Sequence, residues 1–420
     1  MRRIHPSLAM LAVGVLFVAV SSGGTHAVPA IAERRSSEAR LTALGREIFH
    51  DRTLSLRRNQ SCASCHDPAW GFSSPSADVN AHGAVVAGSV PTRFGTRKPP
   101  SAAYAAHSPV LHLDEADSAW VGGGFWDGRA TGRRLGTPAA EQAQLPLVNP
   151  AEQALPDEGC AVYRVTRGSY GALATAVMGQ RTSAIRFPSG TEQLCGREGT
   201  RLALTAVDRA RVRDAYDAIG RALAAFERSD EVSPFSSKYD AFVAGRATLT
   251  DEERRGLSLY EGKGKCAACH PNAGDRALFT DFTFDNLGVP ANPENPALRG
   301  DSAWRDPGLG AVLGDSSLHG AVKVPTLRNV NRRGVAGATK AYMHNGAFKS
   351  LEQVVHFYNT RDVLPSCDWV RHPSVGRNCW PAPEVRENVN RDELGNLGLT
   401  PREERAIVAF LRTLDDGFGK

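Results

Sequence analysis

Two copies of one short cysteine and histidine motif carry the clearest chemistry in this sequence. The pattern C-x-x-C-H occurs at residues 62–66 and again at residues 266–270. Two cysteines at this spacing can bind the vinyl groups of a porphyrin as thioethers, and the adjacent histidine can bind the iron from one face. The sequence therefore predicts two covalently bound c-type haems, attached through Cys62, Cys65, His66, Cys266, Cys269 and His270.

Two other interpretations of these motifs explain less. A thioredoxin-like redox pair needs no histidine after its second cysteine. Half of a zinc site needs a second C-x-x-C close by in the chain, and here the two motifs lie far apart. Haem attachment accounts for both the histidine and the separation.

The start of the chain predicts export. Arg2 and Arg3 precede an uncharged apolar run over residues 8–20, and small residues lead from there to Ala27. This pattern is typical of a secretory signal peptide, which we expect over residues 1–27. The alternative is a membrane anchor, but the run is shorter than the roughly 20 residues that span a bilayer. We therefore expect a periplasmic protein without a transmembrane segment.

Four further cysteines have no histidine beside them. In an oxidising compartment such cysteines form disulfides, and the pairs Cys160–Cys195 and Cys367–Cys379 are the candidates. Sequence alone does not fix this pairing.

The segments around the motifs indicate two related haem units. The sequence GREIF at 45–49 leads into the first motif and GLSLY at 256–260 into the second. Between the motifs, apolar residues at helical spacing predict a helix that ends near Ser229, before Pro234: Val212, Ala215, Ile219, Ala222, Leu223 and Phe226. We place a boundary near residue 232, which divides the mature chain into domains 28–232 and 233–420.

Two capping boxes mark further helix starts. Thr250 with Glu253 begins a helix before the second motif, and Thr400 with Glu403 begins one that closes the chain. Alternating strand patterns are scarce, and the glycine-rich stretch 121–124 is typical of a loop. The predicted fold class is mainly α, with long loops.

Composition excludes several classes of protein. The chain has 50 Lys+Arg and 45 Asp+Glu, a formal net charge of +5, which fits neither a basic nucleic-acid-binding protein nor an acidic tail. With 41% hydrophobic and 23% charged residues the chain is an ordinary globular protein. A length of 420 residues suggests two or three domains.

Five ordered segments together resemble the bacterial di-haem cytochrome c peroxidase family, which includes MauG. They are LGREIFHD at 44–51, SCASCH at 61–66, GFWDGRA at 124–130, VPTLRN at 324–329 and AYMHNG at 341–346. The resemblance runs over nearly the whole mature chain. It implies two cytochrome-c-like haem domains, with an N-terminal peroxidatic haem, a C-terminal electron-transfer haem and a tryptophan between them.

The resemblance also implies residues for the chemistry at the first haem. Trp126 would be the tryptophan between the haems, although a buried tryptophan is more often simple core. The stretch 141–152 is similar to the family's E-Q-A, P and N-P-x-E pattern, which would put Gln142 and Glu152 over the first haem. Glu152 would then be the acid-base group that moves a proton during O–O cleavage. The alternative is that both are solvated helix residues.

At the second haem the family's ligand position falls on Tyr358, fourteen residues after His344. Electron-transfer peroxidases have methionine there, so Tyr358 resembles the His/Tyr ligation of MauG-like members. A phenolate lowers the reduction potential of haem iron relative to a thioether and eases access to higher oxidation states. The alternative is that Tyr358 only packs near the haem edge.

Two further positions depart from the family pattern. Many relatives carry a distal histidine shortly before an R-N-x-P segment, but here His82 lies farther upstream of Arg97. We therefore expect an open or water-bound first haem. The alternatives are a lengthened loop that brings His82 to the iron and a His82 that is only a surface loop residue. Lys98 replaces the asparagine that binds calcium in many relatives. Because an ammonium cannot donate a lone pair to a cation, calcium is doubtful here, although Thr339 and Ala341 could offer carbonyls.

Three functions remain open from the sequence. The first is a di-haem peroxidase that reduces hydrogen peroxide to water with electrons from a small donor protein, such as a c-type cytochrome or a cupredoxin. The second is a MauG-like oxidase that modifies a protein or organic substrate. The third is an electron-transfer cytochrome without enzymatic activity, which would leave Gln142 and Glu152 without a role. We favour the first.

Overall fold

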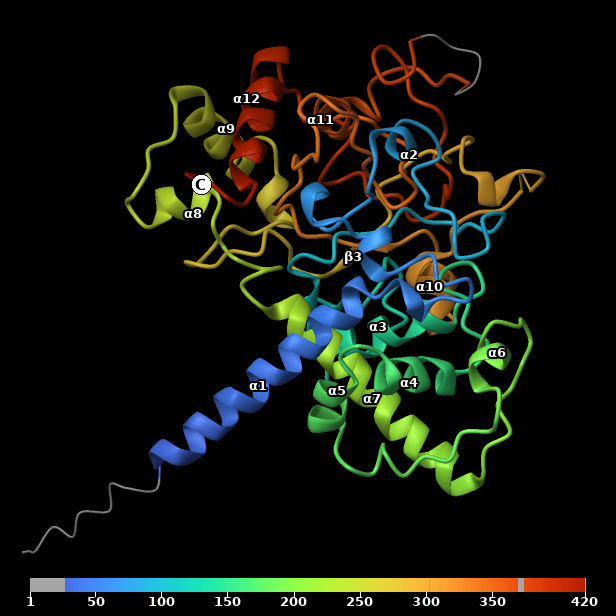
Figure 1. Cartoon of the computed structure of the whole chain (residues 1–420). Helices are drawn as coiled ribbons and strands as arrows, with labels where there is room; N and C mark the ends of the chain where they lie inside the picture. Colours follow the sequence, from blue (N-terminus) through green and yellow to red (C-terminus); the bar gives the residue numbers. More distant parts are fainter. Residues whose placement is uncertain (1–26, 302, 369–373, 420) are drawn as a thin grey trace, which may run out of the picture.

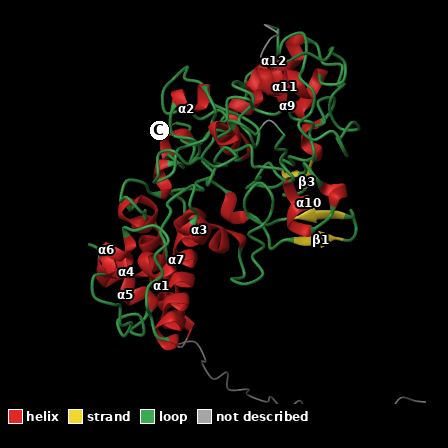
Figure 2. Cartoon of the chain, turned by 90° about the vertical axis from the view of Figure 1, so that its right-hand side faces the viewer, coloured by secondary structure: helices red, strands yellow, loops and turns green. Residues whose placement is uncertain are grey.

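The computed structural model describes residues 27–301, 303–368 and 374–419 (Figure 1). In these residues the chain is mainly helical with long loops, as the sequence predicts, and its strands form two small two-stranded sheets (Figure 2). The predicted signal peptide lies outside the described residues except for Ala27, where helix α1 begins. No described helix is both long and apolar enough to cross a membrane.

The first half of the described chain builds one hydrophobic core between residues 44 and 232. Its central feature is the packing of α1 (Ala27–His50) against α7 (Ala206–Arg228). The other helices of this half are α2 (Ala77–Ala81), α3 (Pro138–Val148), α4 (Glu158–Arg167), α5 (Gly171–Met178) and α6 (Thr191–Cys195). Figures 1 and 2 show α3 to α6 gathered around α7, while the start of α1 projects from the body.

The second half builds its own core between residues 239 and 414. Here α9 (Asp251–Glu261) packs against α12 (Pro401–Leu411). The remaining helices are α8 (Lys238–Val243), α10 (Gly308–Leu313) and α11 (Leu351–Thr360). The two main cores end and begin between residues 232 and 239, whereas a smaller cluster joins Leu111 of the first half to Leu309 and Ala321 of the second, so the domain division near residue 232 stays a proposal.

The two halves use the same helix crossing. A Cβ on Gly45 of α1 would lie 1.9 Å from the carbonyl oxygen of Ala222 on α7. A Cβ on Gly256 of α9 would likewise lie 1.9 Å from the carbonyl oxygen of Ala406 on α12. Glycine at each crossing lets two backbones approach closely, and this contact explains why both lead-in segments begin with that residue.

Most of the helix ends follow the sequence signals. Helix α7 stops at Arg228 with Ser229 as its C-cap, and α9 and α12 begin with the Thr250/Glu253 and Thr400/Glu403 capping boxes. The strands were not predicted individually. They are β1 (His112–Asp114) paired with β2 (Ala119–Val121) and β3 (Phe284–Asp285) paired with β4 (Val322–Lys323), all too short to show alternation.

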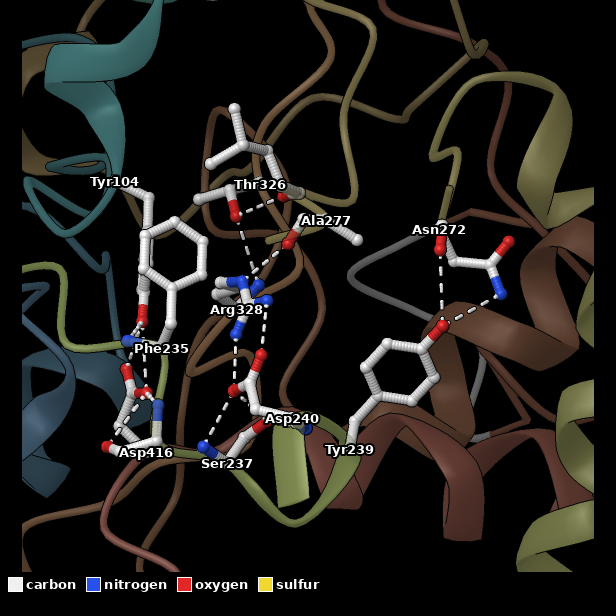
Figure 3. Close-up of polar contacts among 12 residues, drawn as sticks. Tyr104, Phe235, Ser237, Tyr239, Asp240, Asn272, Ala277, Thr326, Arg328 and Asp416 are labelled. Carbon is white, nitrogen blue, oxygen red and sulfur yellow. Dashed lines mark hydrogen bonds and ion pairs between the residues drawn. The ribbon is translucent and has the colours of Figure 1, made fainter. Parts of the chain in front are cut away.

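A polar cluster near the C-terminus joins the two halves (Figure 3). The hydroxyl of Tyr104 donates to the carboxylate of Asp416 at 2.9 Å, and Asp416 also accepts from Asn329 at 2.7 Å and from the backbone of Ser236 at 2.9 Å. Next to it, Arg328 is fully buried and forms a two-pronged ion pair with Asp240, with both N···O distances 2.8 Å. The cluster ties the first half to the last residues of the second.

Candidate functional site

Two internal cavities each contain one of the cysteine and histidine motifs. The first has a volume of about 280 Å³ and is lined by Cys62, Cys65 and His66. The second has a volume of about 200 Å³ and is lined by Cys266, Cys269 and His270. Each motif begins with a short 3₁₀ turn, Cys62–Ser64 or Cys266–Ala268, which brings its two cysteines onto one wall.

The two motif histidines are held in the same way. Nδ1 of His66 lies 3.1 Å from the carbonyl oxygen of Phe72, and Nδ1 of His270 lies 2.8 Å from that of Phe279. A carbonyl can only accept, so Nδ1 carries the proton and Nε2 keeps its lone pair for a metal. Burial lowers the pKa of both imidazoles, that of His270 to about 4, which keeps them neutral.

The cysteines divide as the sequence predicts. Cys160 is bonded to Cys195 and Cys367 to Cys379, so both candidate disulfides are confirmed. The four motif cysteines are free thiols. Free cysteine pairs on a cavity wall, each next to a neutral histidine with an available Nε2, fit a covalently attached haem in each cavity.

The first cavity has a polar part that comes from α3 and the turn after it. Gln142 lies on α3, and Glu152 follows the Asn149 C-cap, whose carbonyl accepts from the backbone N–H of Glu152 at 3.0 Å. Both side chains line the cavity with Cys65 and His66. The structure thus brings together at one cavity the residues that the resemblance implies.

Glu152 has a buried carboxylate oxygen, Oε2, without a hydrogen-bond partner in the described protein. Burial raises the pKa of this carboxyl above its usual value, and the positive charge of Arg129 opposes part of the rise. Arg129 itself pairs with Asp127 at 2.7 Å and lies over the ring of Phe125 at the edge of the cavity. An unpartnered carboxyl in such a place can take up and release a proton.

A second buried acid lines the first cavity and was missed from the sequence. Glu227 lies on α7, and burial raises its pKa to about 8. It follows Leu223 by four residues, so it extends the apolar face that predicted the helix. An acid on an otherwise apolar helix face was the pattern that could have identified it.

Trp126 lies in the wall between the two cavities and lines both. Its indole Nε1 donates to the carbonyl oxygen of Lys98 at 2.8 Å, and its ring meets that of His344 edge to face at 6.5 Å between centroids. This position agrees with the one that the resemblance implies for the tryptophan between the haems.

Tyr358 of α11 lines the second cavity. Burial raises the pKa of its phenol above the usual value, and no hydrogen bond of the phenol oxygen is found among the described residues. Met343 lines the same cavity. Tyr358 and Met343 therefore both lie where they could reach a haem in this cavity.

Comparison with known proteins decides the family. The model of the family described as "Di-haem cytochrome c peroxidase" matches residues 39–248. The methylamine utilization protein MauG of Paracoccus denitrificans is 34% identical over 392 residues, which cover 91% of this chain and 90% of that protein. This chain belongs to the di-haem cytochrome c peroxidase family.

Other members of the di-haem cytochrome c peroxidase family agree with this assignment. The cytochrome c551 peroxidase of Nitrosomonas europaea is 25% identical over 98% of this chain and 91% of its own. The crystal structure of the diheme peroxidase BthA from Burkholderia thailandensis aligns with a TM-score of 0.69 and 33% identity, over 90% of this chain and 86% of that one. The chain is therefore an oxidoreductase of a family whose members act on peroxide.

The histidine considered as a distal ligand in this di-haem peroxidase lies away from the haem cavities. His82 is exposed, and its Nδ1 bonds the carbonyl of Asp78 at 2.8 Å. Among the described histidines, His66 alone lines the first cavity. His82 is thus a surface residue, and the open or water-bound face of the first haem stays a prediction.

The residues around Lys98 do not fit calcium. Lys98 Nζ donates to Ser73 Oγ at 3.1 Å and to the carbonyl of Pro99 at 3.0 Å. Lys340 Nζ donates to three backbone carbonyls, those of Trp70 at 3.2 Å, Asn329 at 2.8 Å and Arg332 at 2.8 Å. Because ammonium groups already take these oxygens, they are not available as ligands for a divalent cation.

Proposed function

We propose that this chain is an exported, periplasmic peroxidase that reduces hydrogen peroxide to water at the haem of the first cavity. Electrons enter through the haem of the second cavity from a small donor protein, a c-type cytochrome or a cupredoxin. The observation that carries the proposal is the buried carboxylate oxygen Oε2 of Glu152, which has no hydrogen-bond partner in the described protein and belongs to a side chain that lines the cavity with Cys65 and His66. A cytochrome that only transfers electrons has no need of such a group.

The roles of the chain's own residues follow from this arrangement. When bound, the haem iron supplies a site for a peroxide oxygen and the electrons that cleave the O–O bond. Glu152 accepts a proton from the inner oxygen and returns it to the outer oxygen, which then leaves as water. The amide of Gln142 donates a hydrogen bond that orients the peroxide. Burial of the cavity strengthens both interactions.

A second function, that of a MauG-like oxidase, is favoured by Tyr358. A phenolate ligand at the second haem stabilises oxidised iron, which suits storage of oxidising equivalents for use on a protein or organic substrate. The 34% identity with MauG of Paracoccus denitrificans supports the same candidate. Both functions use the first cavity for the reaction with peroxide. They differ in the ligand of the haem in the second cavity.

A spectrum of the purified oxidised protein, before and after one equivalent of hydrogen peroxide, tests the proposal. We expect one high-spin haem that reacts within the mixing time. A protein with both haems low-spin and inert to peroxide would contradict peroxidase and oxidase functions alike. Return to the starting spectrum on addition of a reduced small cytochrome supports the peroxidase, and persistence of the oxidised state supports the oxidase.

Trp126 is proposed as the path for electrons between the two haems. Substitution by phenylalanine keeps an aromatic of similar shape and removes the easily oxidised indole. We expect peroxide binding to be unchanged and electron delivery from the second haem to be slower, measured by stopped flow. Equal turnover in both proteins would remove Trp126 from the path.

The activity is proposed to be independent of calcium, because an ammonium stands at position 98, and Lys98 and Lys340 donate to the carbonyls of Pro99 and Asn329. Treatment of the haem-loaded protein with EGTA should leave its spectrum and turnover unchanged. A loss that added calcium restores would show that another part of the chain binds the ion.

A further inference from the structure

The wall between the two haem cavities contains two lysines. Six residues line both cavities: Lys98, Ser101, Trp126, Lys323, Pro325 and Thr326. Lys98 and Lys323 are the two members of this set whose side chains end in an ammonium group. Neither was assigned a role by the peroxide chemistry above.

Both lysines are fixed to Trp126 through their backbones. The indole Nε1 of Trp126 donates to the carbonyl oxygen of Lys98 at 2.8 Å, and the backbone N–H of Lys323 donates to the carbonyl oxygen of Trp126 at 2.7 Å. Lys98 is further held by its own N–H, which donates to the carbonyl oxygen of His344 at 2.8 Å. The two side chains therefore start from defined points on either side of the tryptophan.

The two ammonium groups have no anionic partner in the described protein. Lys98 Nζ donates to Ser73 Oγ and to the carbonyl of Pro99, which uses two of its three protons. Lys323 Nζ lies 5.6 Å from the centroid of the Phe282 ring, and no hydrogen bond or ion pair of this group is found among the described residues. Burial lowers the pKa of each to about 8.

Two arginines elsewhere in the described chain, Arg328, which is buried, and Arg97, which is half-buried, do have such partners. Arg328 pairs with Asp240, and Arg97 makes a two-pronged ion pair with Asp306 at 2.6 Å. A charge removed from water without an opposite charge is costly, so buried charges in proteins are normally paired. Lys98, which is buried, and Lys323, which is half-buried, lack such a partner at the wall that faces both cavities.

A c-type haem brings carboxylates of its own, the propionate groups of its porphyrin. We propose that Lys98 and Lys323 bind propionates of the two haems across their shared wall, so that one pair of ammonium groups holds both cofactors. The proposal rests on the two-haem site of the proposed function, but not on peroxide as the substrate. It makes the lysines positioning residues that orient the haems around Trp126.

The expected consequence is electrostatic coupling of both haems to each lysine. A positive charge next to a haem favours the reduced iron, so its removal lowers the reduction potential. Because the wall is shared, Lys98→Met and Lys323→Met should each lower the potential of both haems. Lys98→Arg retains the charge and should return the potentials most of the way to those of the parent protein.

A spectroelectrochemical titration of the haem-loaded protein tests this. The matched control is Lys238→Met, which removes a lysine that already pairs with Glu253 at 2.6 Å and lines neither cavity. Resonance Raman spectra recorded alongside should show a shift of the propionate bending bands in the two test variants and not in the control.

Each outcome decides the proposal. Potentials of both haems that fall in Lys98→Met and Lys323→Met, with shifted propionate bands, support it. If the reduction potentials of both haems equal those in Lys238→Met, or if only one haem changes its potential, the proposal that each lysine acts on both haems is overturned. If Lys98→Met does not retain its haems, Lys98→Arg and Lys323→Met still give the comparison. The two proposals can be told apart. If the protein does not react with peroxide but the variants show these shifts, the proposed function is wrong and the binding of propionates by the two lysines is supported.

Discussion

The two haem cavities share a frame and differ in the side chains that enter it. In both, the helix before the motif crosses a later helix at a glycine, and a backbone carbonyl accepts from Nδ1 of the motif histidine. The first cavity then receives Gln142 and Glu152 from α3 and its following turn, whereas the second receives Tyr358 from α11 and Met343. The frame fixes where a haem attaches, and segments outside the frame decide what that haem can do.

The largest expected effect is at the first cavity. Glu152→Gln retains the shape of the side chain and removes its acid-base function, so peroxide cleavage should slow by about 10²–10⁴-fold. Stopped-flow absorbance of the haem-loaded protein measures this rate. The matched control is Glu393→Gln, because Glu393 is an acid that lines the second cavity. Equal slowing in both variants would contradict the division of labour between the cavities.

Substitution of the glycine at the helix crossing should lower stability by a similar amount in both halves. Gly45→Ala and Gly256→Ala each place a Cβ 1.9 Å from a carbonyl oxygen of the partner helix. Overpacking of this kind typically costs about 1–3 kcal/mol, and a backbone oxygen cannot move aside as a flexible side chain can. Thermal unfolding should show similar losses for the two, with the exposed Ser258→Ala of α9 near neutral. A loss in one half alone would show that the crossings are not equivalent.

Substitutions in the second cavity should change the reduction potential of its haem. If Tyr358 binds the iron, Tyr358→Met raises the reduction potential of the second haem, since a thioether favours ferrous iron and a phenolate favours ferric. Tyr358→Phe should instead change its spin state. Met343→Leu is the control, because both residues line the cavity. A redox titration in which Met343→Leu gives the change and the Tyr358 variants do not would assign Met343 as the ligand.

The smallest effect concerns the helix that carries Tyr358. Nδ1 of His356 lies 3.0 Å from Glu404 of α12 and Nε2 lies 3.0 Å from the carbonyl of Arg377, so both nitrogens face acceptors. The hydrogen bond to Glu404 raises the pKa of His356, with burial opposing. A raised pKa in the folded state means stabilisation that is complete below pH about 6.5, the unfolded value, and lost as pH rises through the folded pKa.

His356→Gln should therefore be less stable than the parent protein in acid, by less than about 1 kcal/mol, and equal to it in alkali. Urea unfolding at two pH values on either side of this range measures the difference. A gap that widens as pH rises would contradict the assigned sign.

Much of the architecture could be predicted from the sequence because it depends on local patterns. The end of α7 near Ser229 and the capping boxes at Thr250 and Thr400 involve residues within a few positions of each other, and the structure confirms them. Each of the two disulfides also joins cysteines that follow one another along the chain once the four motif cysteines are set aside. These features need no knowledge of how distant segments meet.

The site needed such knowledge, and the sequence supplied it only in part. The resemblance placed Glu152 and Trp126 beside the motifs, but it gave no reason to connect Lys323 with Lys98, which meet at Trp126 from opposite parts of the chain. The sequence pattern indicated no position for a methionine ligand, and folding brings Met343 to the second cavity. Short strands such as Phe284–Asp285 exist only through their partner, so no local pattern shows them.

The polar cluster around Asp416 makes one carboxylate a support that both halves share. Asp416 accepts hydrogen bonds from Tyr104 in the first half and from Ser236 and Asn329 in the second. Because donors from both halves depend on the same side chain, a displacement of Asp416 would disturb the contacts of the two halves together. The relative position of the two halves is therefore coupled to the segment that carries Asp416.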